Sequence, residues 1–124
     1  MRILILGGDG YIGWPAAMYF SSRGHDVTVL DNLWRRNAAR KLEMLPLLPV
    51  PDLLARASAW RELSGQTVRV KIGDLRDETC MRTLFAGDAN VDFGGAPKTP
   101  GFDAVIHLAE QPSAPYSMMN RAAG

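Results

Sequence analysis

Two patterns of hydrophobic residues take turns along the amino-terminal part of the chain, one typical of buried strands and one typical of helices. The unbroken apolar run Ile3–Leu6 is typical of a strand buried on both faces, and we predict a strand over 2–6. Apolar residues then recur at helical spacing and predict a helix over 11–23, with Pro15 in its first turn and Gly24 as its C-cap. We expect the inner face of this helix to consist of Ile12, Ala16, Tyr19 and Phe20.

The same alternation continues toward the carboxyl end. Further strands are predicted at 27–30, 67–72 and 102–109, and further helices at 53–64 and 78–86. Their inner faces are expected to hold Leu53, Ala57 and Trp60 in the first helix and Met81, Leu84 and Phe85 in the second. Asp52 and Gly65 are suited to cap the ends of the helix at 53–64.

The segments between these elements are more polar or are rich in proline and glycine. Residues 32–41 are mostly polar and basic, and 37–41 are expected to form a solvated surface. The prolines at 46, 49 and 51 make 45–51 an extended connector. The glycine-rich stretch 87–101 is predicted to be a loop. Strands alternating with helices indicate parallel pairing and right-handed crossovers. We therefore predict an α/β fold, an incomplete Rossmann-type doubly wound parallel sheet with strand order 3-2-1-4.

A glycine-rich turn follows the first predicted strand. Gly7, Gly10 and Gly13 recur at every third position between this strand and the next helix. Glycine permits the sharp turn, the close approach of a pyrophosphate and close helix packing, while the free N–H groups of the helix start face an anion. The turn contains no lysine, which argues against a P-loop. The alternative is a purely structural glycine turn.

An acidic residue ends the second predicted strand. Asp31 stands about 20 residues after the turn, where a carboxylate accepts a hydrogen bond from the adenosine ribose. Its charge would repel a 2′-phosphate, so NAD is favoured over NADP, although Arg35 or Arg36 could meet such a phosphate. Asn32 and Arg35 are further candidate cofactor contacts. The alternative for Asp31 is a surface aspartate.

Polar residues also follow the third and fourth predicted strands. Asp74 lies where open α/β folds bind ligands and could accept from an adenine amino group; alternatively it caps the next helix, as Asp77 could equally do. His107 is expected to be a core histidine rather than a catalyst, and Cys80 a small buried hydrophobe. Residues 110–119 are either a wall of the site or an ordinary loop.

Composition narrows the class of protein further. The net charge of the 124 residues is +1, so nothing favours nucleic acid or an anionic membrane as a partner. No apolar run approaches the length of a membrane span, and the chain start does not resemble a secretory signal. The single cysteine excludes an internal disulfide and fits a reducing compartment, so we expect a cytoplasmic protein. We expect no metal site.

Taken together, these motifs resemble the extended short-chain dehydrogenase/reductase family, which includes nucleotide-sugar epimerases and dehydratases. The resemblance rests on Gly7–Gly13, Asp31-Asn32, Gly73-Asp74-Leu75 and His107-Leu108-Ala109. The run Glu110-Gln111 with Ser113–Met118, together with the helical segment around Trp60 to Gly65, is similar to the UDP-sulfoquinovose synthase branch of that family. The resemblance covers nearly the whole chain except 87–101.

The resemblance implies a cofactor and substrates. Members of that branch use tightly held NAD to convert UDP-glucose and sulfite into UDP-sulfoquinovose, the head-group donor for sulfolipid, and homodimers are expected. It implies cofactor binding by Gly7, Gly10, Tyr11, Ile12, Gly13, Asp31, Asn32, Arg35, Asp74, Leu75, Leu108, Ala109 and Glu110. It places Gln111, Ser113 and Tyr116 near the sugar or the reactive end of the cofactor.

Two departures from the family pattern limit this expectation. Pro112 stands where plant members carry an arginine, and none of the tyrosines is followed four residues later by lysine. We therefore expect residues 1–124 to be the N-terminal NAD-binding half, without catalytic residues and inactive alone. The alternatives are part of a UDP-sugar 4-epimerase or 4,6-dehydratase, a non-catalytic NAD-binding module, or a chain that does not fold stably alone because its sheet needs later elements to cover it.

Overall fold

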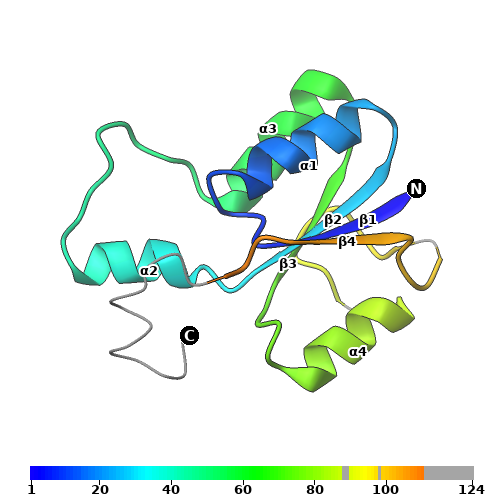
Figure 1. The fold of residues 1–124 in the computed structure, drawn as a ribbon. Helices are drawn as coiled ribbons and strands as arrows, with labels where there is room; N and C mark the ends of the chain where they lie inside the picture. The colour runs from blue at the N-terminus through cyan, green and yellow to red at the C-terminus, as the bar shows by residue number, and fades with distance from the viewer. Residues whose placement is uncertain (88–89, 98, 111–124) are drawn as a thin grey trace.

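The computed structural model describes residues 1–87, 90–97 and 99–110. Within them, strands and helices alternate along most of the chain (Figure 1). The elements are β1 (Arg2–Leu6), α1 (Gly13–Ser22), β2 (Asp26–Asp31), α2 (Trp34–Lys41), α3 (Leu53–Ser64), β3 (Val68–Ile72), α4 (Glu78–Ala86) and β4 (Ala104–His107). The predicted strands and helices are thus all present, with ends that either match the predicted bounds or differ by one or two residues, and α2 is an additional helix that was not predicted.

The strands form one parallel sheet in the order β3-β2-β1-β4. Helices α1 and α3 cover one face of the sheet, and α4 lies on the other (Figure 1). This arrangement confirms the predicted Rossmann-like α/β fold. Because every strand is parallel, the carboxyl ends of β1, β2, β3 and β4 meet at one edge, where the glycine turn also lies.

Both faces of the sheet are buried along β1, as its unbroken apolar run predicts. Ile3 and Ile5 face α1 and α3, in a core that includes Val29 of β2. Leu4 and Leu6 face the other way and pack with Leu84 of α4. Since successive strand side chains point to opposite faces, one four-residue run supplies two cores.

The inner face of α1 differs from the one predicted. Ile12 and Tyr19 are 63% and 52% exposed, whereas Trp14, Ala17 and Ser21 are buried. The helix begins at Gly13, which packs on the carbonyl of Gly7 and thereby turns a neighbouring row of side chains toward the sheet. The predicted row was therefore wrong for Ile12, which precedes the helix, and for Tyr19, which lies on its exposed side. Ala16 and Phe20 still pack partly against the core.

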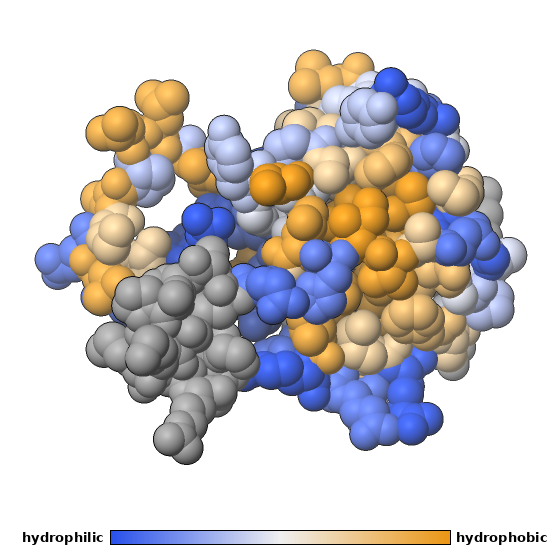
Figure 2. All heavy atoms as spheres, in the orientation of Figure 1, coloured by the Kyte–Doolittle hydropathy of each residue, from blue (hydrophilic) through white to orange (hydrophobic). Residues whose placement is uncertain are grey.

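The segment between β2 and α3 lies mostly outside the core. The basic residues after Asp31 form the helix α2, which buries no residue, in keeping with the predicted solvated surface. The connector that follows carries exposed apolar side chains, seen as orange atoms at the upper left of Figure 2. They are Leu42, Met44, Leu45, Leu47, Leu48 and Val50.

Strand β4 is only partly covered by the described residues. Val105 is 47% exposed, and the His107 side chain is 44% exposed. The prediction of a core histidine was therefore wrong. Its ring instead lies 3.5 Å from the Glu110 carboxylate. Alternate residues of β4, such as Ile106, face the core on the side of α1 and α3.

Helices α3 and α4 are capped as predicted. The Asp52 carboxylate accepts from Ala55 N at 2.8 Å, and Asp77 does the same for Cys80 N at 3.2 Å. Asp77, and not Asp74, is therefore the cap of α4. Among the residues described, no helix combines the length and apolar character needed to cross a membrane.

Candidate functional site: a glycine turn at the carboxyl edge of the sheet

The turn between β1 and α1 is too tight for side chains at Gly7 and Gly13, and also at Gly8, whose Cβ would lie 2.4 Å from Val29 Cβ. Gly7 has φ +91°, and a Cβ there would lie 2.6 Å from the carbonyl oxygen of Leu108. A Cβ on Gly13 would overlap the carbonyl of Gly7. These contacts confirm the steric reasons for which glycine was expected at both positions. Gly10 differs, because among the described residues, its two chain neighbours aside, only Gly7 O lies within 4 Å of its Cβ position, at 3.2 Å.

The start of α1 presents free backbone donors. Within the described part of the chain, the N–H groups of Tyr11 and Ile12 donate no hydrogen bond. No side chain caps the helix, and its first turn contains no acidic residue. Unpaired N–H groups and the positive end of a helix dipole together attract an anion. The bare position of Gly10 leaves room for that anion to approach.

The end of β4 lies beside the turn. Leu108 N donates to Leu6 O at 2.9 Å, which continues the sheet alongside Gly7. Ala109 is partly buried against the core on the α4 side, and Glu110 is exposed. Of the predicted cofactor contacts at 108–110, Leu108 and Ala109 are thus brought next to the glycine turn.

Asp31 lies at the end of β2, and its side chain links the glycine turn to the backbone just before α2. Its Oδ2 accepts from Asp9 N at 2.9 Å and its Oδ1 accepts from Leu33 N at 2.7 Å. Burial raises the pKa of this carboxyl above its ordinary value, and the two backbone donors only partly offset that effect. Each oxygen accepts one described bond, so the carboxylate retains capacity to accept a ribose hydroxyl.

Asn32 and Asp74 meet at the same edge, although they come from different strands. Asn32 Nδ2 donates to Asp74 Oδ2 at 3.3 Å, and Arg76 forms an ion pair with Asp74 at 2.8 Å. The bond from Arg76 holds the pKa of Asp74 well below its usual range, so the group is a carboxylate at neutral pH. Leu75 packs partly against the core that contains Leu84.

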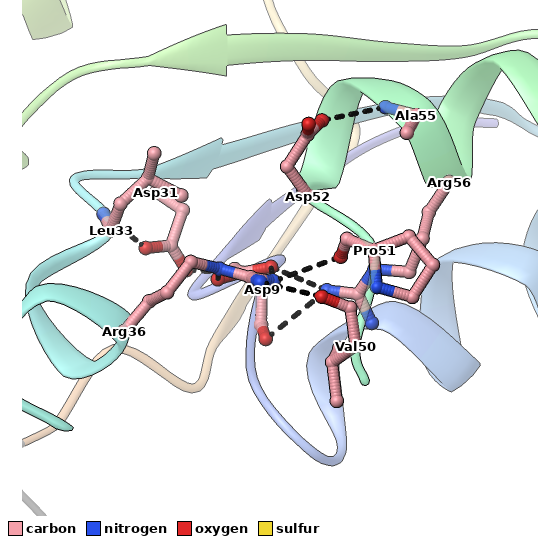
Figure 3. Close-up of polar contacts among 9 residues, drawn as sticks. All are labelled: Asp9, Asp31, Leu33, Arg36, Val50, Pro51, Asp52, Ala55 and Arg56. Carbon is pink, nitrogen blue, oxygen red and sulfur yellow. Dashed lines mark hydrogen bonds and ion pairs between the residues drawn. The ribbon is translucent and has the colours of Figure 1, made fainter. Parts of the chain in front are cut away.

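An ion-pair cluster beside the turn was missed in the sequence analysis. Asp9 pairs with Arg36 of α2 at 2.7 Å and with Arg56 of α3 (Figure 3). The Asp9 side chain is only 8% exposed. A charged residue in a glycine turn is a sequence signal for such a cluster, but its partners lie too far along the chain to be identified from spacing.

The other predicted contacts lie at the margin of this site or outside it. Arg35 is exposed in the first turn of α2, and no interaction with its guanidinium is found among the described residues. Gln111, Ser113 and Tyr116 lie outside the residues that the structure describes. In the described ranges, no group of three or more histidine, cysteine or acidic side chains is placed to hold a metal ion.

Comparison with known proteins yields two kinds of nucleotide-sugar enzyme. The chain is 35% identical over 98% of its length to the chloroplastic UDP-sulfoquinovose synthase of Spinacia oleracea. It is 32% identical over 97% of its length to a UDP-sulfoquinovose synthase of Sulfolobus acidocaldarius. It is also 34% identical over 88% of its length to the UDP-glucose 4-epimerase of Erwinia amylovora. The chain spans 23%, 28% and 24% of these relatives.

A family model matches almost all of the chain. The match runs from residue 3 to residue 123. It therefore includes the glycine turn and all the described strands and helices, apart from Arg2, the first residue of β1. A parallel sheet in the order β3-β2-β1-β4, with a glycine turn at its carboxyl edge, agrees with this match. The chain belongs to the NAD dependent epimerase/dehydratase family.

Proposed function

We propose that the chain is the NAD-binding part of a nucleotide-sugar enzyme of the UDP-sulfoquinovose synthase type. The observation that carries this proposal is the pair of unoccupied N–H groups at Tyr11 and Ile12, next to the bare backbone of Gly10. A pyrophosphate supplies the oxygens that such donors require. We propose that the partly buried carboxylate of Asp31, at the end of β2, accepts a hydrogen bond from the ribose of the same dinucleotide.

The remaining residues of the edge fit the rest of the dinucleotide. We propose that Asn32 and Arg35 flank the adenosine ribose, and that Asp74 and Leu75 border the adenine. Leu108 and Ala109 would border the cofactor on the β4 side, because they lie beside Gly7, and we propose that Glu110, the next residue, does the same. NAD supplies a hydride acceptor when bound. What this chain contributes is the orientation of the cofactor.

The substrates are proposed from the relatives. Two UDP-sulfoquinovose synthases match at 35% and 32% identity and over nearly the whole chain, which favours UDP-glucose and sulfite as substrates of the complete enzyme. Gln111, Ser113 and Tyr116 are the residues of this chain that we propose near the sugar. The second candidate is a UDP-glucose 4-epimerase, which the 34% identity to the Erwinia amylovora enzyme supports.

Titration with NAD tests the cofactor proposal. Asp31→Ala is expected to weaken NAD binding about tenfold, because a buried hydrogen bond to a charged group is lost. Asp103→Ala is the matched control. Asp103 also accepts from a backbone N–H, that of Arg2, but lies at the opposite end of the strands. Saturable NAD binding to the wild type, weakened by Asp31→Ala alone, supports the proposal; no binding by a folded wild-type chain refutes it.

The product of the reaction separates the two candidate enzymes. Protein that contains this sequence would be incubated with UDP-glucose, NAD and sulfite. The nucleotide-sugar products would be separated by liquid chromatography and identified by retention time and mass, because UDP-galactose and UDP-glucose have the same mass. A sulfite-dependent gain in mass supports the sulfoquinovose synthase, whereas UDP-galactose formed without sulfite supports the epimerase. We expect residues 1–124 alone to give neither product.

A further inference from the structure

The carboxylate of Asp9 is occupied by two guanidinium groups. Its Oδ1 accepts from Arg36 Nη2 at 2.7 Å and from Arg56 Nη2, and its Oδ2 accepts from Arg36 Nε at 3.0 Å (Figure 3). Arg36 therefore binds in the two-pronged geometry that is the strongest arginine–carboxylate contact. The two arginine side chains are only 16% and 17% exposed, so solvent screens these pairs weakly.

The backbone around the cluster holds both arginines in place. Arg36 Nη1 donates to Val50 O at 3.0 Å and its Nη2 donates to Pro51 O at 3.1 Å. Arg56 Nη2 also donates to Asp9 O at 3.3 Å, and its guanidinium lies 5.3 Å from the centre of the Trp14 ring. Four of the five N–H groups of the Arg36 guanidinium are thus engaged, whereas Arg56 Nε has no hydrogen-bond partner among the described residues.

This cluster adjoins the proposed ribose site. The N–H of Asp9 itself donates to Asp31 Oδ2 at 2.9 Å, so the two aspartates are linked through one hydrogen bond. The two carboxylates and two guanidiniums carry no net charge together. A 2′-phosphate would be attached to the ribose hydroxyl that Asp31 is proposed to bind, and a nearby arginine is what accommodates such a phosphate in NADP-binding relatives of this fold.

We propose that Asp9 is a specificity-determining residue, which selects NAD over NADP by keeping Arg36 and Arg56 occupied. This inference rests on the proposed function, because it assumes that a dinucleotide binds at the turn. Discrimination against the 2′-phosphate then has two sources. Asp31 repels the phosphate directly, and Asp9 withholds the positive charges that would otherwise attract it.

The test compares the affinities of the chain for NAD and NADP. Asp9→Asn removes the negative charge at nearly constant volume, and Asp9→Ser removes it with a shorter side chain. Each is expected to strengthen NADP binding about tenfold, the effect of one added charge-assisted hydrogen bond. NAD affinity is expected to change less than about threefold. Asp103→Asn, which loses an aspartate–arginine pair at the far end of the strands, is the matched control.

A double variant assigns the gain to a particular arginine. Arg36→Gln combined with Asp9→Asn is expected to abolish the stronger NADP binding. As a single substitution, Arg36→Gln is expected to alter NADP affinity less than about threefold, because the Arg36 guanidinium is already paired with Asp9. A larger loss of NADP affinity in this variant overturns the inference, even if the Asp9 variants fail to fold. Folded Asp9 variants with unchanged NADP affinity also overturn it. A wild type that binds neither nucleotide refutes the proposed function instead.

Discussion

At the scale of single residues, two glycines of the turn are expected to respond differently to substitution. A Cβ on Gly13 would overlap the carbonyl of Gly7, whereas one on Gly10 would meet Gly7 O at 3.2 Å and otherwise open space. Gly13→Ala is therefore expected to lower the free energy of unfolding by about 3 kcal/mol, the cost of overpacking a tight site.

Gly10→Val is expected to leave most of that stability intact and to block the approach of the pyrophosphate. Urea denaturation measures the first effect and NAD titration the second. Unchanged NAD affinity in Gly10→Val would show that the dinucleotide is held elsewhere. Wild-type stability in Gly13→Ala would contradict the close contact between the helix and the turn.

The buried carboxyl of Asp31 predicts a pH dependence. Its pKa is raised from 3.8 by burial, so it takes up its proton at a higher pH than an ordinary aspartate. Protonation removes an acceptor for the ribose, and NAD affinity is expected to fall as the pH decreases through that raised pKa. The effect of this group on the free energy of unfolding has the opposite pH dependence. Because the folded chain binds the proton more tightly than the unfolded chain does, this carboxyl stabilises the fold more at low pH, and that stabilisation is lost as the pH rises through the raised pKa.

NAD titrations between pH 7 and pH 4 measure this effect. Asp31→Asn is the control, because it cannot titrate and should bind weakly at every pH. A wild-type affinity that is flat over this range would mean that the Asp31 carboxylate does not contact the cofactor.

Single residues also show how far the sequence can be interpreted. Glycine was predicted correctly at positions 7 and 13, because the left-handed φ of +91° at Gly7 and the contact of Gly13 with Gly7 both belong to the turn itself. The pairing of Asp9 with Arg36 and Arg56 was not, because the partners lie 27 and 47 residues away and meet only in the folded chain. The contact between Asn32 and Asp74 is of the same kind, separated by 42 residues.

At the scale of elements, the N-cap of α3 supports the cluster around Asp9. Asp52 accepts from Ala55 N at 2.8 Å, and the helix it starts carries Arg56. Asp52→Ala is expected to lower the free energy of unfolding by about 1 kcal/mol. Glu62→Ala, in the exposed part of the same helix, is the control and should change stability by less than about 0.5 kcal/mol.

Thermal and urea unfolding of the two variants provide the comparison. Equal stabilities would indicate that the cap contributes nothing to the fold. A loss of NAD affinity in Asp52→Ala that exceeds its loss of stability would instead indicate that α3 positions the turn through Arg56.

Elements differ in how well their patterns predict them. Helix α3 lies at its predicted bounds because Asp52 and Gly65 mark both ends in the sequence. The buried row of α1 was mispredicted because its register is set by the contact of Gly13 with Gly7, which apolar spacing does not reveal. Helix α2 buries no residue, so it lacks the apolar stripe from which a helix is predicted.

At the scale of the whole molecule, β4 is the outer strand of the described sheet on the β1 side. Val105 on this strand is 47% exposed, and exposed apolar strands at a sheet edge favour association between copies. Val105→Thr is expected to reduce concentration-dependent association, measured by light scattering, without weakening NAD binding.

A second valine-to-threonine substitution distinguishes the effect of changing an exposed strand residue from the effect of changing a core residue. Val27 in β2 is fully buried, so Val27→Thr is expected to lower the free energy of unfolding by about 2 kcal/mol, since a hydroxyl is buried there. Association that is equal in wild type and Val105→Thr would show that this strand is not the associating surface.

The hydrogen bonds between Arg56 and Asp9 make the amino-terminal bend dependent on a helix encoded much later. Transplanting residues 7–13 into another scaffold would therefore transfer the glycines but leave Asp9 without its counter-ions. A working graft would need α3 and the stretch around Arg36 as well. The smallest unit that engineers can move between proteins is thus the whole β1–α3 segment, not the short consensus by which such sites are usually recognised.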